Sequence, residues 1–191
     1  ASLYGHVDRL EDGELESIRA NYAGEVTMVD RWLGRFLDKL DDLGVSDETM
    51  VLAISDHGHS IGEHNIVAKQ CYPMTPEIAD LCLLIKHPNC KEKGVVSDDF
   101  VYNYDLFTTI LSAMDVDYRK ANQNVVGRDL NPLLTTGNNN NLSDRDHVTT
   151  GWGAFVMVRD DRYWYNDYLW GEIPLLFDMK SDKGFSTNIA K

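Results

Sequence analysis

Apolar positions near the start of the chain recur at steps of three or four residues. They are Leu15, Ile18, Tyr22, Val26, Val29, Leu33, Leu37, Leu40 and Leu43. This spacing is helical periodicity with one apolar face. Gly44 follows the last apolar position and fits a helix stop. The pattern therefore predicts a helix of about thirty residues.

Two short apolar runs follow, and each has the length of a strand. Residues 49–54 read T-M-V-L-A-I, a continuous β-prone run typical of a strand covered on both faces. Residues 81–86 predict a second buried strand, closed by His87-Pro88. A further helix is expected from about Asp105 to Met114. This order of helix, strand, strand and helix predicts part of an α/β layered sheet.

The character of the chain changes after the low-complexity stretch Asn138–Asn141. Residues 152–170 are rich in aromatic and other β-prone side chains and are broken by Asp160-Asp161, a pattern that predicts antiparallel hairpins. We therefore expect residues 1–137 to form part of an α/β domain. Residues 138–191 are expected to form a small antiparallel subdomain.

Composition narrows the possible partners. The 191 residues carry a formal net charge of −13, which opposes binding to nucleic-acid phosphates. No apolar run approaches the ~20 residues of a membrane span. The three cysteines form no C-x-x-C motif and cannot all pair, which favours a reducing compartment such as the cytoplasm. Localisation is otherwise left open.

Candidate chemistry begins where the first predicted strand ends. Asp56 and His57 stand there, and in open α/β sheets ligands bind beyond the carboxyl ends of the strands. Both side chains can reach one metal ion if the chain turns sharply, which Gly58 permits. The alternative is a polar turn that caps the strand, with His57 bonded to a carbonyl.

Lys69 follows a polar cluster that contains His59, Glu63 and His64. A lysine in this position is either a solvated surface residue or a cation that faces a tetrahedral anion and helps a leaving group depart. For His59 and His64 we expect hydrogen bonding within the turn. The sequence holds no G-x-S-x-G, Walker A, G-x-G-x-x-G or H-E-x-x-H motif.

These residues form part of a longer resemblance. Residues 51–65 read V-L-A-I-S-D-H-G-H-S-I-G-E-H-N, and with Lys69 they resemble the sulfatase signature. The helix before this stretch and the segments 77–88, 104–106, 127–134 and 176–190 resemble sulfatase segments in the same order, with Leu83 and Lys86 where proline and arginine are usual. The chain thus resembles the C-terminal part of a sulfatase of the alkaline phosphatase superfamily, which also contains phosphonate and phosphate ester hydrolases.

The resemblance implies roles for three residues. Asp56 and His57 would bind the active-site divalent cation. Lys69 would contact the sulfate or phosphate group and the leaving oxygen. Ca²⁺ is the expected metal, and Mn²⁺ or Zn²⁺ are alternatives because one ligand is a nitrogen. The implied substrate is a small-molecule or glycan sulfate ester, and the implied fold is an alkaline-phosphatase-like layered sheet with flanking helices.

The resemblance also implies parts that this sequence does not match. Sulfatases use a formylglycine nucleophile made in a C-x-P/A-x-R motif and an early pair of aspartates, and both are expected upstream. Cys71 begins C-Y-P-M-T, but Thr75 stands where arginine belongs and the motif lies after the signature. Asp41-Asp42 lies in the predicted helix. We therefore expect the partner of this chain to be a missing N-terminal half, and the isolated chain to be inactive.

Three functions remain open at this point. The first is a metal-dependent sulfuric ester hydrolase in the intact protein. The second is a phosphonate or phosphate ester hydrolase on the same scaffold. The third is a non-catalytic module that binds a partner or oligomerises, which an exposed patch of Trp152, Trp164 and Trp170 would indicate.

Overall fold

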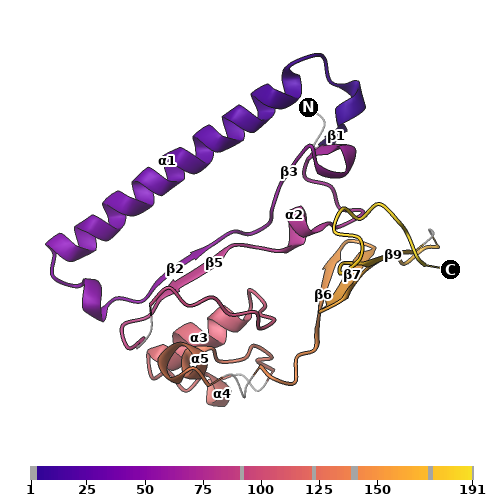
Figure 1. Ribbon diagram of the computed structural model, residues 1–191. Coiled ribbons are helices and arrows are strands. Elements are labelled where there is room, and N and C mark those ends of the chain that lie inside the picture. Colours follow the sequence, from indigo (N-terminus) through magenta and orange to yellow (C-terminus); the bar gives the residue numbers. More distant parts are fainter. Residues whose placement is uncertain (1–3, 91–92, 122–123, 139–141, 172–173, 191) are drawn as a thin grey trace. The chain divides into compact units, whose positions relative to one another are not determined.

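The structure is a computed structural model that describes residues 4–90, 93–121, 124–138, 142–171 and 174–190 (Figure 1). The helices are α1 (Glu14–Asp42), α2 (Pro76–Ala79), α3 (Asp105–Ala113), α4 (Tyr118–Ala121) and α5 (Asn131–Thr136). The strands are β1 (Tyr4–His6), β2 (Val51–Ile54), β3 (Ser60–Ile61), β4 (Ile66–Ala68), β5 (Leu83–Lys86), β6 (His147–Trp152), β7 (Phe155–Asp160), β8 (Tyr163–Tyr168) and β9 (Leu175–Asp178). Short 3₁₀ turns are η1 (Val7–Arg9), η2 (Ser46–Glu48) and η3 (Glu63–Asn65).

The chain divides into two compact units. The first contains residues 1–88, 150–157 and 162–191, and the second contains residues 89–149 and 158–161. The expected division of the chain into residues 1–137 and 138–191 stays a prediction. Residues 139–141 of the low-complexity stretch lie outside the described residues. None of the described helices has the length and apolar character that a bilayer crossing needs.

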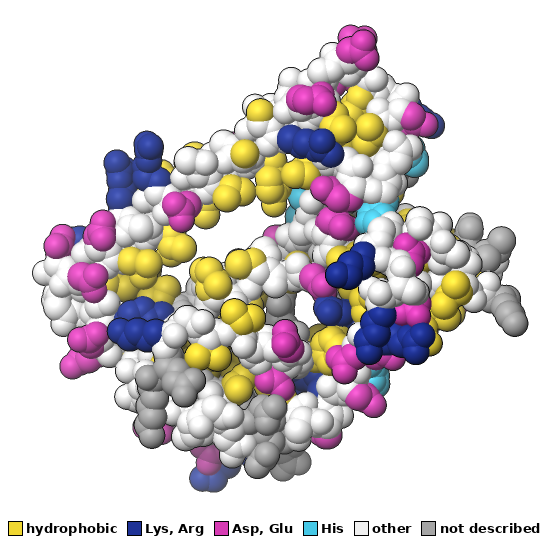
Figure 2. Space-filling model, viewed as in Figure 1, with side chains coloured by type: hydrophobic (Ala, Val, Ile, Leu, Met, Phe, Trp, Pro, Cys, Tyr) yellow, Lys and Arg dark blue, Asp and Glu magenta, His cyan; other side chains and the backbone are white. Residues whose placement is uncertain are grey.

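The predicted long helix is confirmed as α1, which has 29 residues. It ends where Gly44 adopts a left-handed conformation with φ of 68° and donates its N–H to the carbonyl of Asp41 at 2.9 Å. Hydrophobic side chains gather along one side of the helix (Figure 2). They are solvent-exposed, with Val29 at 61% and Trp32 at 60%. The helix therefore has an apolar face that the described residues do not bury.

The two predicted strands are confirmed as β2 and β5, but their expected burial is wrong for this chain. They pair antiparallel, with Val51 opposite Lys86 and Ile54 opposite Leu83. Ile54 is 43% exposed and Leu84 is 58% exposed. The described residues supply no layer that covers these side chains. A second small sheet has the strand order β1-β4-β3.

The hydrophobic core lies on the C-terminal antiparallel sheet, whose strand order β6-β7-β8-β9 confirms the predicted hairpins. Met74, Met157, Trp164 and Phe177 form this core. Trp164 is fully buried and donates its Nε1–H to the carbonyl of Met74 at 2.8 Å. The hypothetical exposed patch of Trp152, Trp164 and Trp170 is therefore wrong, because Trp164 faces the core.

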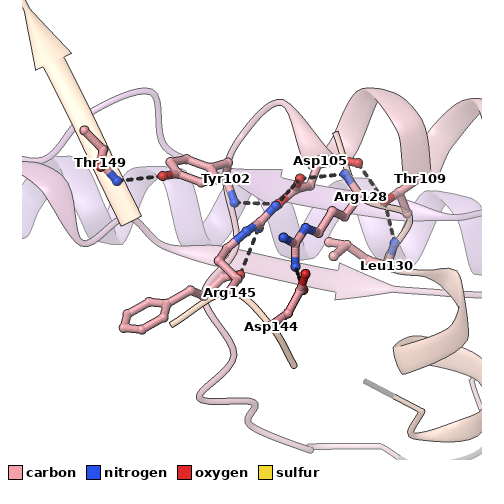
Figure 3. A network of polar contacts seen from close by, with 9 residues as sticks. Tyr102, Asp105, Thr109, Arg128, Leu130, Asp144, Arg145 and Thr149 are labelled. Atoms are coloured by element: carbon pink, nitrogen blue, oxygen red, sulfur yellow. Dashed lines mark hydrogen bonds and ion pairs between the residues drawn. The ribbon is translucent and has the colours of Figure 1, made fainter. Parts of the chain in front are cut away.

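The second unit is organised by a buried carboxylate at the start of α3 (Figure 3). Asp105 is 0% exposed and accepts hydrogen bonds from the amides of Tyr102 (2.7 Å) and Arg128 (2.8 Å). Arg145 donates to both carboxylate oxygens of Asp105 and lies 4.8 Å from the ring centre of Tyr102. Burial alone would lower the pKa of Arg145, but the hydrogen bond and charge of Asp105 raise it. The predicted helix near residues 105–114 is thus confirmed, and the bonds to Asp105 hold its first turn in place.

Candidate functional site

The site begins at the end of β2, where the pairing with β5 continues for one more residue. Ser55 donates its amide N–H to the carbonyl of Cys82 at 3.2 Å. The Oγ of Ser55 accepts the amide N–H of Cys82, also at 3.2 Å. These two bonds hold the backbone immediately before Asp56. The position of Asp56 is therefore set by the strand pair rather than by a free loop.

Gly58 brings the next part of the loop close to α2. Its amide N–H donates to the carbonyl of Ile78 at 2.9 Å. A β-carbon at this position would lie 1.8 Å from the carbonyl oxygen of Glu77. The residue has to be glycine because the two backbones touch, and this contact fixes the turn that follows His57.

The side chains of Asp56 and His57 lie together. The carboxylate of Asp56 accepts the amide N–H of His57 at 2.9 Å, and its other oxygen lies 3.5 Å from His57 Nε2. His57 Nδ1 lies 2.9 Å from the carbonyl of Gly58, so Nδ1 carries the proton and Nε2 keeps its lone pair. The carbonyl bond expected for a simple polar turn is thus present, and Nε2 is the ring nitrogen that accepts a hydrogen bond or binds a cation.

Lys69 directly follows β4, and its side chain reaches His57. Three residues before it adopt left-handed backbone conformations, with φ of 55° at His64, 62° at Asn65 and 75° at Ala68. Such conformations are unfavourable for residues with a side chain and are typical of functional loops. Lys69 Nζ lies 2.9 Å from His57 Nε2. The structure therefore brings Asp56, His57 and Lys69 together.

The two neighbouring histidines have contacts of their own. His64 Nε2 lies 3.2 Å from a carboxylate oxygen of Glu77, which ties the loop to α2. The ring of His59 stacks on Tyr22 of α1, with 5.9 Å between ring centres. Burial lowers the pKa of His59, and the nearby Lys69 lowers it further. His59 and His64 therefore make contacts with α1 and α2, respectively.

The donor atoms present can hold part of a metal site. An oxygen of Asp56 and Nε2 of His57 are 3.5 Å apart, a separation that lets both bind one cation at the usual ~2.0–2.5 Å. Within the described ranges, no group of three or more histidine, cysteine, aspartate or glutamate side chains is arranged to hold a metal ion. These two residues fit a divalent cation as a partial ligand set once Lys69 Nζ, which lies 2.9 Å from His57 Nε2, turns away from that nitrogen.

The sequence did not predict that one further residue lies in this region. Trp152, at the end of β6, places its ring centre 5.1 Å from Lys69 Nζ. A cation at this distance from an indole ring is attracted to the negative face of the ring. The sequence singled out Trp152 only as part of a possible partner patch, because no local pattern connects it to a lysine so far away in the chain.

Comparison with known proteins matches this part of the chain to a family. The family model described as Sulfatase matches residues 5–116, which is more than half of the chain and includes Asp56, His57 and Lys69. The chain belongs to the sulfatase family. This confirms the resemblance of the signature stretch and places the chain in the alkaline phosphatase superfamily.

Individual sulfatase relatives extend the match. Arylsulfatase K of Xenopus laevis is 32% identical over 93% of this chain and 34% of its own length. An N-acetylglucosamine-6-O-sulfatase of Bacteroides thetaiotaomicron is 30% identical over 60% of this chain and 20% of its own length. The solved phosphonate monoester hydrolase of Silicibacter pomeroyi matches with a TM-score of 0.81 at 26% identity, and the match covers 96% of this chain and 39% of that chain.

These matches confirm the expected α/β fold class. They also show that the chain spans about a third of the length of the curated relatives it matches, with 38%, 34% and 36% covered in three of them. The activity of a whole protein that contains this chain is therefore a matter for proposal.

Proposed function

We propose that this chain supplies part of the active site of a metal-dependent sulfuric ester hydrolase. The observation that carries the proposal is the meeting of Asp56, His57 and Lys69 at the end of β2, with 2.9 Å between Lys69 Nζ and His57 Nε2. The segment that matches the sulfatase family contains all three residues. In the intact protein the nucleophile comes from outside residues 1–191, as the resemblance implies.

In this proposal Lys69 is the residue that contacts the substrate. Its ammonium group faces the anionic ester group and the oxygen that departs. Negative charge grows on that oxygen as the ester bond breaks, so a fixed cation stabilises the transition state more than the ground state. The left-handed residues before Lys69 aim its side chain, and Trp152 flanks it at 5.1 Å.

Asp56 and His57 are proposed to hold the divalent cation. The exposed carboxylate of Asp56 is a hard oxygen donor that suits Ca²⁺, whereas the imidazole nitrogen of His57 also suits Mn²⁺ or Zn²⁺. When bound, such an ion neutralises charge on the ester oxygens. The bond from His57 Nδ1 to the carbonyl of Gly58 keeps Nε2 in the form that binds metals. Ca²⁺ is the preferred assignment.

Hydrolysis of phosphonate or phosphate esters is the second candidate. The observation in its favour is the TM-score of 0.81 to a phosphonate monoester hydrolase over 96% of this chain. The same lysine and the same cation would serve a tetrahedral phosphorus centre. The binding or oligomerisation module is not carried further, because the buried Trp164 removes the patch on which it depended.

The test compares two esters with the same leaving group in the full-length protein. We expect kcat/KM for 4-nitrophenyl sulfate to exceed that for 4-nitrophenyl phenylphosphonate by about tenfold or more. Asp56→Ala should lower the sulfate activity by at least ~100-fold, and residues 1–191 alone should give no turnover. A preference for the phosphonate would favour the second candidate. Full activity of Asp56→Ala would exclude this site.

A further inference from the structure

Glu77 of α2 contacts both segments that carry the candidate site. Its side chain meets His64, which lies in the loop before Lys69. Its backbone carbonyl packs directly against Gly58, the neighbour of His57. We propose that His64 and Glu77 are positioning residues, whose contact holds Lys69 against the oxygen that departs. The inference rests on the proposed function, because Lys69 is taken as the residue that faces this oxygen.

The contact between the two side chains is direct and largely shielded from water. His64 Nε2 lies 3.2 Å from Oε2 of Glu77, and the two side chains are 17% and 28% exposed. A carboxylate only accepts hydrogen bonds, so the hydrogen in this bond belongs to His64 Nε2. A hydrogen bond to a charged acceptor is stronger than one between neutral groups, and it keeps more of its strength where water is largely excluded. The bond therefore links the loop firmly to α2.

The ring of His64 has a second contact that limits its movement. Phe185 meets this ring edge-on, with 5.7 Å between ring centres and an angle of 73° between the rings. Phe185 itself lies 5.6 Å from Trp164 and 5.0 Å from Phe177, again between ring centres, and both of these residues belong to the buried core. The core of the C-terminal sheet therefore supports the ring of His64 in addition to Glu77.

The backbone of this loop is unfavourable on its own. His64, Asn65 and Ala68 have positive φ values of 55°, 62° and 75°. A side chain crowds the backbone in this left-handed region, so such residues persist where surrounding contacts compensate for the cost. The bond to Glu77 and the packing on Phe185 are contacts of this kind. A loop that lost them would relax towards more ordinary backbone conformations.

Strand β4 connects the position of this loop to that of Lys69. The strand lies between β1 and β3 in its sheet. Its last residue, Ala68, pairs with Tyr4 on one side and with Ser60 on the other, and Lys69 follows directly. A strand that is hydrogen-bonded on both sides moves together with its sheet rather than by itself. A shift of the loop relative to α2 therefore shifts Lys69 as well.

The backbone contact of Glu77 fixes the other side of the site. A β-carbon on Gly58 would lie 1.8 Å from the carbonyl oxygen of Glu77, so the two backbones touch. The amide N–H of Gly58 also donates to α2 at 2.9 Å, and its carbonyl accepts the Nδ1–H of His57 at 2.9 Å. Helix α2 thus holds His57 through the backbone and Lys69 through the bond to His64.

A small displacement of Lys69 has a chemical consequence. Stabilisation of a departing oxygen depends on the distance and direction of the cation, and a misplacement of about 1 Å can cost on the order of 10²-fold in rate. The cost grows with the charge that the oxygen develops, so it is larger for a poor leaving group than for a good one. A residue that only keeps the protein folded affects both kinds of ester equally. The leaving group therefore separates the two roles.

The experiment compares phenyl sulfate with 4-nitrophenyl sulfate, whose leaving group departs more easily, in the full-length protein. Glu77→Leu keeps most of the side-chain volume and removes the carboxylate. It should lower kcat/KM by about 30-fold or more for phenyl sulfate and by less than about fivefold for 4-nitrophenyl sulfate. Glu77→Gln can still accept the bond from His64 and should keep both values within about threefold of wild type.

Matched variants test the same contact from its other end. Asparagine tolerates a left-handed backbone but is shorter than histidine, so His64→Asn should change the two kcat/KM values in the same ratio as Glu77→Leu. The control is Asp146→Asn, because Asp146 pairs with His147 at 2.7 Å but its side chain is 88% exposed. It should leave both values within about twofold. Equal losses for the two esters in Glu77→Leu and His64→Asn would overturn the inference.

A double variant shows whether Glu77 acts through Lys69. Once the cation is gone, its position no longer matters. In the Lys69→Ala background, Glu77→Leu should therefore lower kcat/KM for phenyl sulfate by less than about threefold further. Losses that multiply in the double variant would mean that Glu77 acts independently of Lys69, and this result would also overturn the inference.

The proposed function and the positioning role fail in different ways. A wild-type enzyme that cleaves 4-nitrophenyl phenylphosphonate but no sulfate ester overturns the proposed function alone. In that case the same comparison of leaving groups is made with phenyl and 4-nitrophenyl phenylphosphonate. A large loss in Lys69→Ala together with equal losses for both esters in Glu77→Leu overturns the positioning role alone.

Discussion

Two clusters in this chain use the same kinds of charged residue in opposite ways. Around Asp105 the carboxylate is 0% exposed, and Arg145, with 6% of its side chain exposed, donates to both oxygens. Around Asp56 the carboxylate side chain is 88% exposed and lies beside His57, whose side chain is 38% exposed. One cluster is closed and the other is open to a ligand.

The difference follows from what burial does to a charge. Taking a carboxylate out of water is costly unless hydrogen bonds and an opposite charge compensate for the lost hydration. Asp105 has these partners, and its cluster can therefore contribute only to the fold. Asp56 and Lys69 keep access to solvent, so their remaining lone pairs and protons are available for an ion or an ester. A cluster of charged side chains is a candidate site when some of its donor and acceptor atoms remain open to solvent.

The largest effect is expected from Asp105→Ala. This change leaves the guanidinium of Arg145 buried without its carboxylate, which should reduce the free energy of unfolding by about 3–5 kcal/mol. Urea unfolding of the full-length protein measures it. The control is Asp144→Ala, which removes the 77% exposed partner of Arg128 and should cost less than ~1 kcal/mol. Equal losses in the two variants would mean that the Asp105 cluster is no more important than a surface pair.

Lys69→Ala should affect rate rather than stability. Loss of the cation that faces the departing oxygen should lower kcat by roughly 10²–10³ with little change in melting temperature. The loss should be larger for an alkyl sulfate than for 4-nitrophenyl sulfate, because a good leaving group needs less help. Lys86→Ala is the matched control, since Lys86 Nζ is bonded to the carbonyls of Ser46 and Thr49 and should leave kcat within about twofold. A kcat within threefold of wild type for Lys69→Ala would make Lys69 a surface residue.

Gly58→Ala tests whether the arrangement of Asp56, His57 and Lys69 depends on the close backbone contact between Gly58 and α2. The new methyl group would lie 1.8 Å from the carbonyl oxygen of Glu77, so the loop and α2 have to move apart. We expect a loss of stability of roughly 1–3 kcal/mol, together with a lower kcat because His57 shifts relative to Lys69. Differential scanning calorimetry and steady-state kinetics measure the two effects. Gly24→Ala in α1, where a β-carbon meets nothing within 4 Å, is the control and should not destabilise the protein.

The smallest effect is expected from an ion pair at the surface. Arg162 lowers the pKa of Asp178 to about 2, and the amide of Lys180 also lowers it. Because the folded-state pKa is below its ordinary value of 3.8, the stabilisation is fully present above pH ~4 and is lost as the pH falls towards 2. The difference in urea midpoint between wild type and Asp178→Asn should therefore shrink over this range. A difference that stays constant from pH 5 to pH 2 would exclude the linkage.

Local patterns explain what could be predicted from the sequence. The apolar spacing of α1 and the β-prone runs of β2 and β5 involve neighbouring residues, so the elements could be assigned from the sequence. The meeting of Asp56, His57 and Lys69 was also expected, because the whole signature lies within residues 51–69. Its geometry agrees with the expectation, and the catalytic and metal-binding roles stay predictions.

Contacts between distant segments explain what could not be predicted. The exposure of Ile54 and Leu84 depends on which layers cover the strand pair, and no local pattern records that. Arg145 lies 40 residues from Asp105, so no spacing rule connects them. In the sequence, nothing distinguishes Trp164 from the other aromatic residues between positions 152 and 170. Its burial depends on which face of β8 meets Met74, and that contact spans 90 residues.

The bonds between Met74 and β8 have a consequence for synthesis of the protein. The amide of Met74 donates to Asn166 and its carbonyl accepts from Trp164, across 92 and 90 residues of chain. At a translation rate of about 5–20 residues per second, the segment after Lys69 waits roughly 5 to 20 seconds before its partner strand is made. During that interval the nascent chain has the signature residues but lacks the strand that fixes the segment behind them. A ribosome that pauses between residues 75 and 164 would therefore lengthen the period in which Met74 and its apolar neighbours are open to chaperones.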